Sequence, residues 1–442
     1  MTGPVPPGQT AVVFLSQGSG ALDGAFCPSE VTPALTDTPI IYTSGTTKSF
    51  HLSTSKPVGA YSIYPYGGAA SFIPSATLLF PTSAWTTNYI AVDGFPGILG
   101  TVGAGAVPSF PRTFLQVVAQ DDDTEVRMLP VSDVVEGDGF PAGTAGATQT
   151  WHLSRGQVVQ FLQNTSLAGS AIESSKPVGL FGGTECTDLP FASTYACDTL
   201  DQQIPPLGGW GSEYALVPYP SRLEGGKGTS REITGNETVP YRIVGAVDGT
   251  ELTYDPVIPI GAPRVLGKGQ VTMFMSNEYV TVKSQDAAHP FYVAVFMTGS
   301  TFNGTQTYGD PDFVNLVPSE QFLDRYVFAT DFTYADTNLT VVRRKAGADF
   351  QPVTLDCAGE ITGFRPLGSN GDYEYAFVRL TSFRTPQVFD AGTCSYGSHE
   401  IKSDGPFGVT VWGIDICASY GYPGGMGLRS LNTVTVEAPA VH

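Results

Sequence analysis

The sequence has few charged side chains and no extended basic cluster. Only 14 % of its 442 residues are charged, and 41 Asp and Glu outnumber 22 Lys and Arg, which gives a formal net charge of −19. The one basic run is the short Arg343–Lys345. A nucleic-acid groove requires a concentrated basic surface, so the composition excludes nucleic acid as an expected partner. Dispersed negative charge instead favours a soluble acidic protein.

Long hydrophobic runs are also missing. No stretch reaches the roughly 18–20 uninterrupted apolar residues that a membrane-spanning helix requires. The most apolar region, residues 60–80, is interrupted by Pro65, Gly67, Gly68 and Pro74. We therefore predict no membrane span. The first residues contain neither a basic n-region nor an apolar h-region, which leaves open whether a signal peptide has been removed.

The patterns of common catalytic and metal sites are missing as well. The five His residues form no HExxH pair, no Ser lies in a GxSxG motif, and the glycine-rich residues 97–105 lack the Lys-Ser/Thr of a P-loop. No pair stands out among the 41 acidic residues as a candidate for glycoside hydrolysis. We predict no catalytic residue, no cofactor and no metal site, and we keep a carbohydrate-active enzyme as the weakest alternative.

Turn-forming residues, by contrast, are abundant. The 52 Gly and 34 Pro residues separate short runs rich in Val, Ile, Phe, Tyr and Thr. Such spacing is typical of strands joined by turns and leaves almost no room for long helices. The sequence therefore predicts an all-β fold.

A short sequence motif recurs four times, at intervals about as long as a small domain. A segment containing Lys and Ser leads to a proline and then to an apolar run at Pro57, Pro177, Pro290 and Pro406, which are 120, 113 and 116 residues apart. We expect each proline at a strand entrance, where its missing N–H does no harm. The period predicts tandem pseudo-repeats of about 115 residues, each a β-sandwich or barrel-like module. An elaborated β-propeller is the alternative, although blades usually repeat at shorter intervals.

Two further patterns support this period. An aromatic residue is followed four residues later by Tyr in three places, which are Trp85/Tyr89, Trp210/Tyr214 and Phe322/Tyr326. The turn residues of 122–124 and 248–250 lie between alternating runs at matching positions, and they predict β-hairpins.

The period divides the chain into four parts. We predict a partial N-terminal β repeat at 1–77, β repeats at 78–203 and 204–314, and a β repeat with a closing C-terminal strand at 315–442. Because both ends are incomplete, we expect the termini to lie close together and to complete each other.

The six cysteines form an even set without CxxC or Cys/His spacing, which favours disulfides over zinc and predicts an oxidising location. Cys186 and Cys197 are 11 residues apart around a loop that can close on itself, so theirs is the best-supported pair. The remaining predicted pairs are Cys357 with Cys394 and Cys27 with Cys417. Buried free thiols are the alternative.

Four tyrosines are candidates for binding. Tyr64, Tyr66, Tyr420 and Tyr422 are set among Pro and Gly, which predicts that they lie in loops. Exposed loop tyrosines contact proteins and sugars. Structural packing of the turns is the alternative role.

Several segments resemble the N-terminal domain family of the IgGFc-binding protein. They are Gly182–Pro190, Ala196–Pro206, Trp210–Pro218, Gly408–Gly413 and Ser419–Gly425, and the similarity spans about residues 50 to 427. The resemblance implies a secreted or surface-displayed protein without catalytic residues, whose animal relatives in mucus bind the Fc part of immunoglobulin G. It also implies a Cys186–Cys197 disulfide and a framework role for Pro205, Pro206, Trp210 and Tyr214.

We therefore predict a secreted or surface-displayed, non-catalytic binding or adhesion protein that recognises a protein or glycan through its loops. The principal alternative is a structural subunit of an extracellular filament, coat or particle, in which neighbouring subunits complete the incomplete ends by self-assembly.

Overall fold

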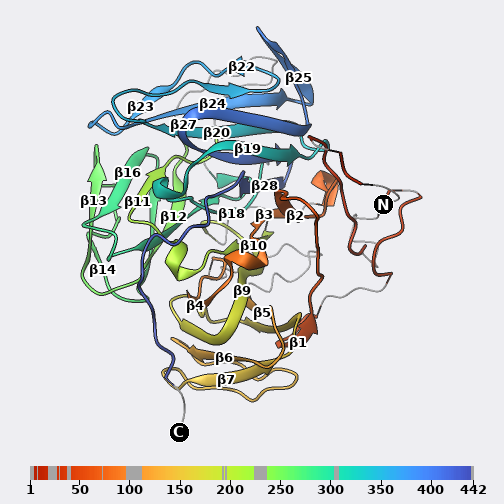
Figure 1. Ribbon diagram of the computed structural model, residues 1–442, viewed down its shortest axis with the longest axis vertical. Helices are drawn as coiled ribbons and strands as arrows, with labels where there is room; N and C mark the ends of the chain where they lie inside the picture. Colours follow the sequence, from red (N-terminus) through yellow and green to blue (C-terminus); the bar gives the residue numbers. More distant parts are fainter. Residues whose placement is uncertain are drawn as a thin grey trace.

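The computed structural model is built from strands and short 3₁₀ turns (Figure 1). It describes residues 4–6, 8–17, 27–28, 30–36, 41–71, 73–95, 112–191, 194, 197–222, 236–302 and 308–439. Strands make up 49 % and helical residues 3 %, so the all-β prediction is confirmed. Among the described residues there is no helix with the length and apolar character needed to span a bilayer.

The second module shows the common plan. Its strands are β4 (Thr86–Ile90), β5 (Thr113–Ala119), β6 (Thr124–Leu129), β7 (Gln149–Leu153), β8 (Gln157–Gln163), β9 (Ala171–Thr187) and β10 (Asp198–Ile204). The 17-residue β9 belongs to two layers, because its first part pairs with β4 and β6 and its second part with β5 and β10. β7 extends one layer by pairing with β6, and β8 extends the other by pairing with β5. The two layers enclose one apolar core.

Two further modules follow this plan. The third contains β11 (Glu213–Leu216), β12 (Val239–Gly245), β13 (Thr250–Asp255), β14 (Val265–Leu266), β15 (Val271–Ser276), β16 (Val280–Ser284), β17 (Phe291–Met297) and β18 (Asp312–Asn315). The fourth contains β19 (Leu323–Thr330), β20 (Asp336–Arg344), β21 (Val353–Leu355), β22 (Gly359–Glu360), β23 (Arg365–Leu367), β24 (Tyr373–Ser382), β25 (Thr385–Phe389), β26 (Gly392–Cys394), β27 (Gly397–Asp415) and β28 (Ala418–Pro423).

The six strand pairings of the second module recur in both. In the third module they are β11–β16, β13–β16, β13–β14, β12–β15, β12–β17 and β17–β18. In the fourth they are β19–β27, β21–β27, β21–β22, β20–β24, β20–β27 and β27–β28. Each module is thus a two-layered structure and not the single-sheet blade of the propeller alternative.

The repeated prolines mark the point where the long strand passes between layers. In β9 and β27 the register shifts between residues 173 and 178 and between 402 and 407, so Pro177 and Pro406 lie in irregular stretches of a continuous strand. In the third module the strand breaks there, and Pro290 directly precedes β17. The missing N–H therefore costs no ladder hydrogen bond, although only Pro290 lies at a strand entrance as predicted.

In each of these three modules, the tyrosine of the aromatic pattern forms a hydrogen bond with the residue after the repeated proline. The hydroxyl of Tyr89 donates to the carbonyl of Val178, that of Tyr214 to Phe291, and that of Tyr326 to Phe407. Every acceptor is the residue that follows the repeated proline. Each tyrosine oxygen also accepts a hydrogen bond from the backbone N–H three residues earlier. This bond connects the first strand of each module, which is β4, β11 or β19, to the strand segment that follows the repeated proline.

The modules meet around a hub that consists of β3 (Ser75–Leu79), β10, β18 and β28. β3 contacts β10 and β28, and β18 contacts the same two strands from the other side. Each hub strand is the second strand of a hairpin that starts after one of the four prolines. β2 (Ala60–Tyr64) pairs with β3, so the N-terminal part supplies a single hairpin where the others supply whole modules. β1 (Gly45–Lys48) joins the second module by pairing with β8.

The hub contains buried carboxyl groups. Asp198, Asp310 and Asp312 are 0 % exposed, and one oxygen of each has no hydrogen-bond partner. Burial raises the pKa of all three, and the neighbouring Asp310 and Asp312 raise that of Asp198 further. The nearby Arg222 is already paired with Glu237 at 2.8 Å. Negative charge in the hub is therefore poorly compensated.

The C-terminal part of the chain packs on the N-terminal hairpin, but its last described residues run elsewhere. Asn88 exchanges two side-chain hydrogen bonds with the backbone of Val436, and Asn432 donates to the carbonyl of Trp210. Residues 432–436 of the C-terminal tail therefore lie along the second module and the start of the third. The described N-terminal residues lie on another side, where Phe14 contacts Tyr66 (Figure 1). C-terminal residues before this tail do cover the N-terminal hairpin β2–β3, because β28 contacts β3 and Met426 packs against Leu78 and Phe80. The tail itself forms no closing strand through residue 439.

The turns at 122–124 and 248–250 do not form hairpins. β5 and β6 flank the first turn, but each pairs with β9, and the same holds for β12 and β13 with β17 and β16. Turn residues indicate that the chain reverses, but they leave open whether it stays in one layer.

Two disulfides are present, Cys186–Cys197 and Cys357–Cys394. The Cys27–Cys417 pairing was wrong, because both are free thiols. Cys417 is buried in the turn after β27 and its thiol faces the Ser300 hydroxyl at 3.9 Å. That pairing rested on the expected closure of the chain ends.

Candidate binding surface

The fourth module differs from the others in several connections, and one of them precedes its long strand β27. In the second module, residues 164–170 join β8 to the long strand β9. In the third module, residues 277–279 join β15 to β16. In the fourth module the connection between β24 and β27 spans 383–396 and contains β25 and β26. β25 lies at the upper end of the molecule in Figure 1.

The connection begins with a strained turn. Phe383 and Arg384 link β24 to β25 and have φ values of 47° and 62°. Two-residue hairpin turns of this kind normally contain Asn-Gly, because a side chain at positive φ costs roughly 1–2 kcal/mol per residue. Phe383 is nevertheless a large aromatic residue, 46 % exposed. Such strain is retained in folded proteins mainly at functional sites.

Neighbouring groups hold the turn in place. The Arg384 N–H donates to the carbonyl of Ala335 at 2.7 Å, and the Phe383 N–H donates to the carboxylate of Asp336 at 2.7 Å. The Arg384 guanidinium forms an ion pair with Asp415 and donates to the carbonyl of Thr333 at 3.1 Å. The strained backbone is thus fixed against the loop between β19 and β20.

That loop carries a chain of aromatic rings. The ring centroid of Phe332, a residue 50 % exposed, lies 6.0 Å from that of Tyr66 and 6.1 Å from that of Tyr396. Tyr64 and Tyr396 are each 47 % exposed. We call Tyr64, Tyr66, Phe332, Phe383 and Tyr396 the aromatic surface.

Backbone hydrogen bonds join the loops of this surface. The N–H of Gly67 donates to Asp331 at 2.5 Å, and the N–H of Ala69 donates to the Thr333 hydroxyl at 3.2 Å. Partial burial and the Asp331 carboxylate raise the pKa of Tyr66. The loops that carry Tyr66 and Phe332 are therefore held together, whereas the ring centroid of Phe383 lies 6.5 Å from that of Tyr308.

The other two predicted tyrosines are not in loops. Tyr420 and Tyr422 lie in β28 and are 0 % exposed. Their hydroxyls bond to the backbone N–H of Asp331 and the carbonyl of Ala329. The prediction was wrong because the neighbouring glycine serves a strand: a Cβ at Gly421 would lie 2.4 Å from the ring of Trp412.

A cavity of about 390 Å³ lies on the same added connection. Its lining includes Phe377 and Arg379 of β24, Val388 and Phe389 of β25, and Glu360 of β22. Val388 is 81 % exposed, and Arg379 donates to the amide oxygen of Asn338 at 3.4 Å. The cavity offers an apolar wall with one acidic and one basic group, which suits part of a peptide better than a charged cofactor.

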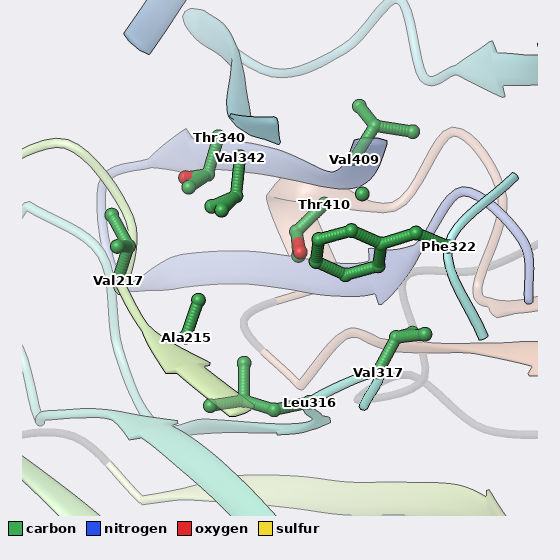
Figure 2. Close-up of a pocket in the computed structure, with 10 residues that line it drawn as sticks. Ala215, Val217, Leu316, Val317, Phe322, Thr340, Val342, Val409 and Thr410 are labelled. Atoms are coloured by element: carbon green, nitrogen blue, oxygen red, sulfur yellow. The ribbon is translucent and has the colours of Figure 1, made fainter. Parts of the chain in front are cut away.

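A second cavity is only a packing gap. It has a volume of about 30 Å³ and lies between the third and fourth modules, where Ala215, Phe322 and Thr410 help to line it (Figure 2). This is the space of about one or two water molecules. It carries no argument for ligand binding.

Sequence reasoning located two of the five residues of the aromatic surface, Tyr64 and Tyr66. It missed Phe332, Phe383 and Tyr396. The turn at Phe383 contains none of the residues that announce a hairpin, so its local sequence gave no signal. The longer connection between β24 and β27 would have been visible only from an alignment of the modules.

A family model described as IgGFc binding protein matches residues 75–413. The match begins at β3 and ends within β27, and it includes Phe332, Phe383 and Tyr396 but not Tyr64 and Tyr66. No curated protein and no solved structure matches the chain.

Proposed function

Because the chain belongs to the IgGFc binding protein family, we propose that it is a secreted or surface-displayed, non-catalytic protein that binds a protein partner through the aromatic surface. The observation that carries this proposal is Phe383, an exposed aromatic side chain held on a turn with two positive φ angles. The family description makes the Fc part of immunoglobulin G the first partner to test.

The chemistry of the surface supports a protein partner. Aromatic residues are enriched at protein interfaces, and a few of them often supply most of the binding energy. The ring of Phe332 already contacts those of Tyr66 and Tyr396, so binding would order few side chains and lose little conformational entropy. Arg384, whose side chain is 60 % exposed, adds a charged group beside Phe383.

The cysteine pattern supports the proposed location. Disulfides persist in oxidising compartments, and two are present in the described residues. We also propose that the modules are sequence repeats with boundaries near residues 77, 203 and 314, where β3, β10 and β18 end. Their shared strand pairings and tyrosine hydrogen bonds support that division.

The proposal is tested by binding to an immobilised Fc fragment. We expect the double variant Phe332→Ala and Phe383→Ala to weaken binding at least tenfold, which corresponds to about 1.4 kcal/mol. Tyr42→Ala is the matched control, because Tyr42 is 65 % exposed and lies outside the aromatic surface. If the unchanged chain fails to bind, the Fc fragment is not its partner. If the double variant binds as well as the unchanged chain, the surface is wrongly assigned.

Light scattering and a glycan array separate the alternatives. A discrete species in solution agrees with a binding protein, whereas a polymer that persists on dilution would favour a structural subunit. If the chain binds a glycan and the binding depends on the same two phenylalanines, the aromatic surface is correctly assigned but its partner is a glycan and not a protein.

A further inference from the structure

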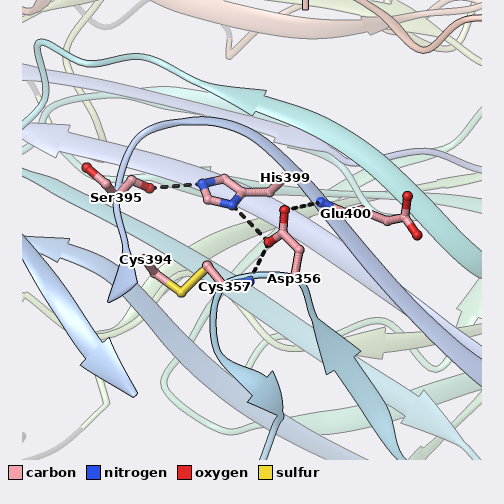
Figure 3. The surroundings of a disulfide bond; sticks show 6 residues. All are labelled: Asp356, Cys357, Cys394, Ser395, His399 and Glu400. Atoms are coloured by element: carbon pink, nitrogen blue, oxygen red, sulfur yellow. Dashed lines mark hydrogen bonds and ion pairs between the residues drawn. A yellow bond between two sulfur atoms is a disulfide. The ribbon is translucent and has the colours of Figure 1, made fainter. Parts of the chain in front are cut away.

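Side chains of the kinds that bind metal ions lie around the Cys357–Cys394 disulfide of the fourth module (Figure 3). Asp356, Cys357 and His399 each place one possible ligand atom within 4.8 Å of the other two. Asp356 and Cys357 follow β21, and Cys394 ends β26. His399 is the third residue of β27 and pairs with Phe328 of β19. His399 is only 7 % exposed.

The hydrogen bonds of His399 determine which nitrogen faces the group. Nε2 lies 2.9 Å from the carbonyl oxygen of Ser395. A carbonyl only accepts, so Nε2 carries the hydrogen, and in the neutral ring the lone pair belongs to Nδ1. Nδ1 lies 3.1 Å from the Asp356 carboxylate.

Asp356 faces His399 as an acceptor. Its carboxylate already accepts hydrogen bonds from the N–H groups of Cys357 at 2.7 Å and Glu400 at 3.1 Å. A lone pair on Nδ1 opposite this carboxylate is repulsive unless a positive species lies between them. A hydrogen shared by the two groups or a metal ion removes this repulsion.

The spacing suits zinc. Two ligands at about 2.0–2.1 Å from a tetrahedral Zn²⁺ are about 3.3 Å apart, close to the 3.1 Å between Nδ1 and Asp356. The Ser395 carbonyl would orient the ligating imidazole, as outer partners of zinc-bound histidines do. In the oxidised chain, however, both sulfurs are bonded to each other and neither is a thiolate.

We propose that reduction of the Cys357–Cys394 disulfide creates a Zn²⁺ site formed by Asp356, Cys357 and His399, with Cys394 as the fourth ligand. A thiol reductant supplies the two electrons: two reductant thiols become one disulfide, and the protein disulfide becomes two thiols. Zn²⁺ then binds the two thiolates as their protons leave to solvent. The disulfide and the metal thus exclude each other at one place in the fold.

The second disulfide is an internal control. The part of the chain that the structure describes contains no comparable ligand group at Cys186–Cys197. A chain with Cys186→Ser and Cys197→Ser should therefore retain the proposed site. The inference does not depend on the proposed function, because it concerns neither Phe332 nor Phe383.

The experiment is a Co²⁺ titration of the full chain after reduction with the phosphine TCEP, which becomes its oxide as water supplies the oxygen and the thiol protons. We expect one equivalent of Co²⁺ to bind with thiolate-to-metal absorption, to be displaced by Zn²⁺, and to bind at least 100-fold more weakly to the oxidised chain. His399→Gln and Asp356→Asn should each weaken binding about 10–100-fold. Circular dichroism establishes that each sample remains folded.

A second variant keeps the test decisive if reduction unfolds the chain. Cys394→Ala frees the Cys357 thiol without any reductant and leaves Cys186–Cys197 intact. It should bind Co²⁺ with one thiolate ligand, and adding His399→Gln should weaken that binding at least tenfold. The proposal is overturned if neither the reduced chain nor this variant binds Co²⁺, or if His399→Gln has no effect on the affinity.

Discussion

The second and fourth modules share a framework but differ in what they expose. Both contain the same six strand pairings and the same tyrosine hydrogen bond to the residue after the repeated proline. Only the fourth has the extended connection 383–396, with its strained turn, adjoining cavity and disulfide. We propose that the repeated framework provides stability and that this enlarged connection provides recognition. Function is commonly added to a stable scaffold in this way.

The largest expected effect is a loss of stability when a buried framework residue is replaced, compared with the replacement of a residue of the aromatic surface. Trp210 is 1 % exposed, packs 5.4 Å from the ring of Tyr292 and donates its indole N–H to Pro205. We expect Trp210→Ala to lower the free energy of unfolding by about 3–5 kcal/mol. Phe332→Ala should change it by less than about 0.5 kcal/mol. Urea denaturation measures both, and equal losses would contradict the division.

The shared hydrogen bond should contribute similarly in every module. Tyr89→Phe, Tyr214→Phe and Tyr326→Phe each leave the buried carbonyl after the proline without its donor. We expect each to lower the free energy of unfolding by about 1–3 kcal/mol. A loss in only one module, measured by the same denaturation, would show that the three bonds are not equivalent.

The hub makes stability depend on pH. Burial raises the pKa of Asp198, Asp310 and Asp312, so the folded state binds protons more tightly than the unfolded state, in which such groups titrate near 4. Stability is therefore fully present at low pH and is lost as the pH rises toward the folded-state values. We expect the free energy of unfolding to fall by about 1 kcal/mol or more between pH 5 and pH 8.

The variant Asp310→Asn provides the control for this dependence. Its neutral amide removes one titrating group from the hub, so the decline between pH 5 and pH 8 should become shallower. Arg222, Glu237 and Tyr334 also lie near these carboxyls and stay unchanged in the variant. Burial also raises the pKa of Asp201 in β10 to about 7, so an equally steep decline would show that Asp310 does not contribute to it.

The smallest expected effect has the opposite sign. Asn tolerates positive φ better than Phe, so Phe383→Asn should raise the free energy of unfolding by about 0.5–1 kcal/mol while it weakens partner binding. Thermal denaturation and the Fc-fragment assay measure the two quantities. A variant that is less stable and binds normally would show that Phe383 is structural.

The sequence predicted the fold well where a residue type has a single structural role. Pro177 and Tyr89 occur at a recurring spacing because they join the same strands, and the all-β class followed from the spacing of Gly and Pro. The buried Tyr420 and Tyr422 were misplaced because Gly within a strand resembles Gly in a turn. Phe383 could not be found, since its backbone conformation depends on bonds to residues some 50 positions away.

One chimera tests the central claim most directly. Residues 383–396 are replaced by residues 164–170, the corresponding connection of the second module, and Cys357 becomes Ser. We predict that the chimera folds cooperatively, with the circular dichroism of a β protein, and no longer binds the Fc fragment that the unchanged chain binds. A chimera that binds the fragment with unchanged affinity would contradict the claim that the fourth module's connection carries recognition.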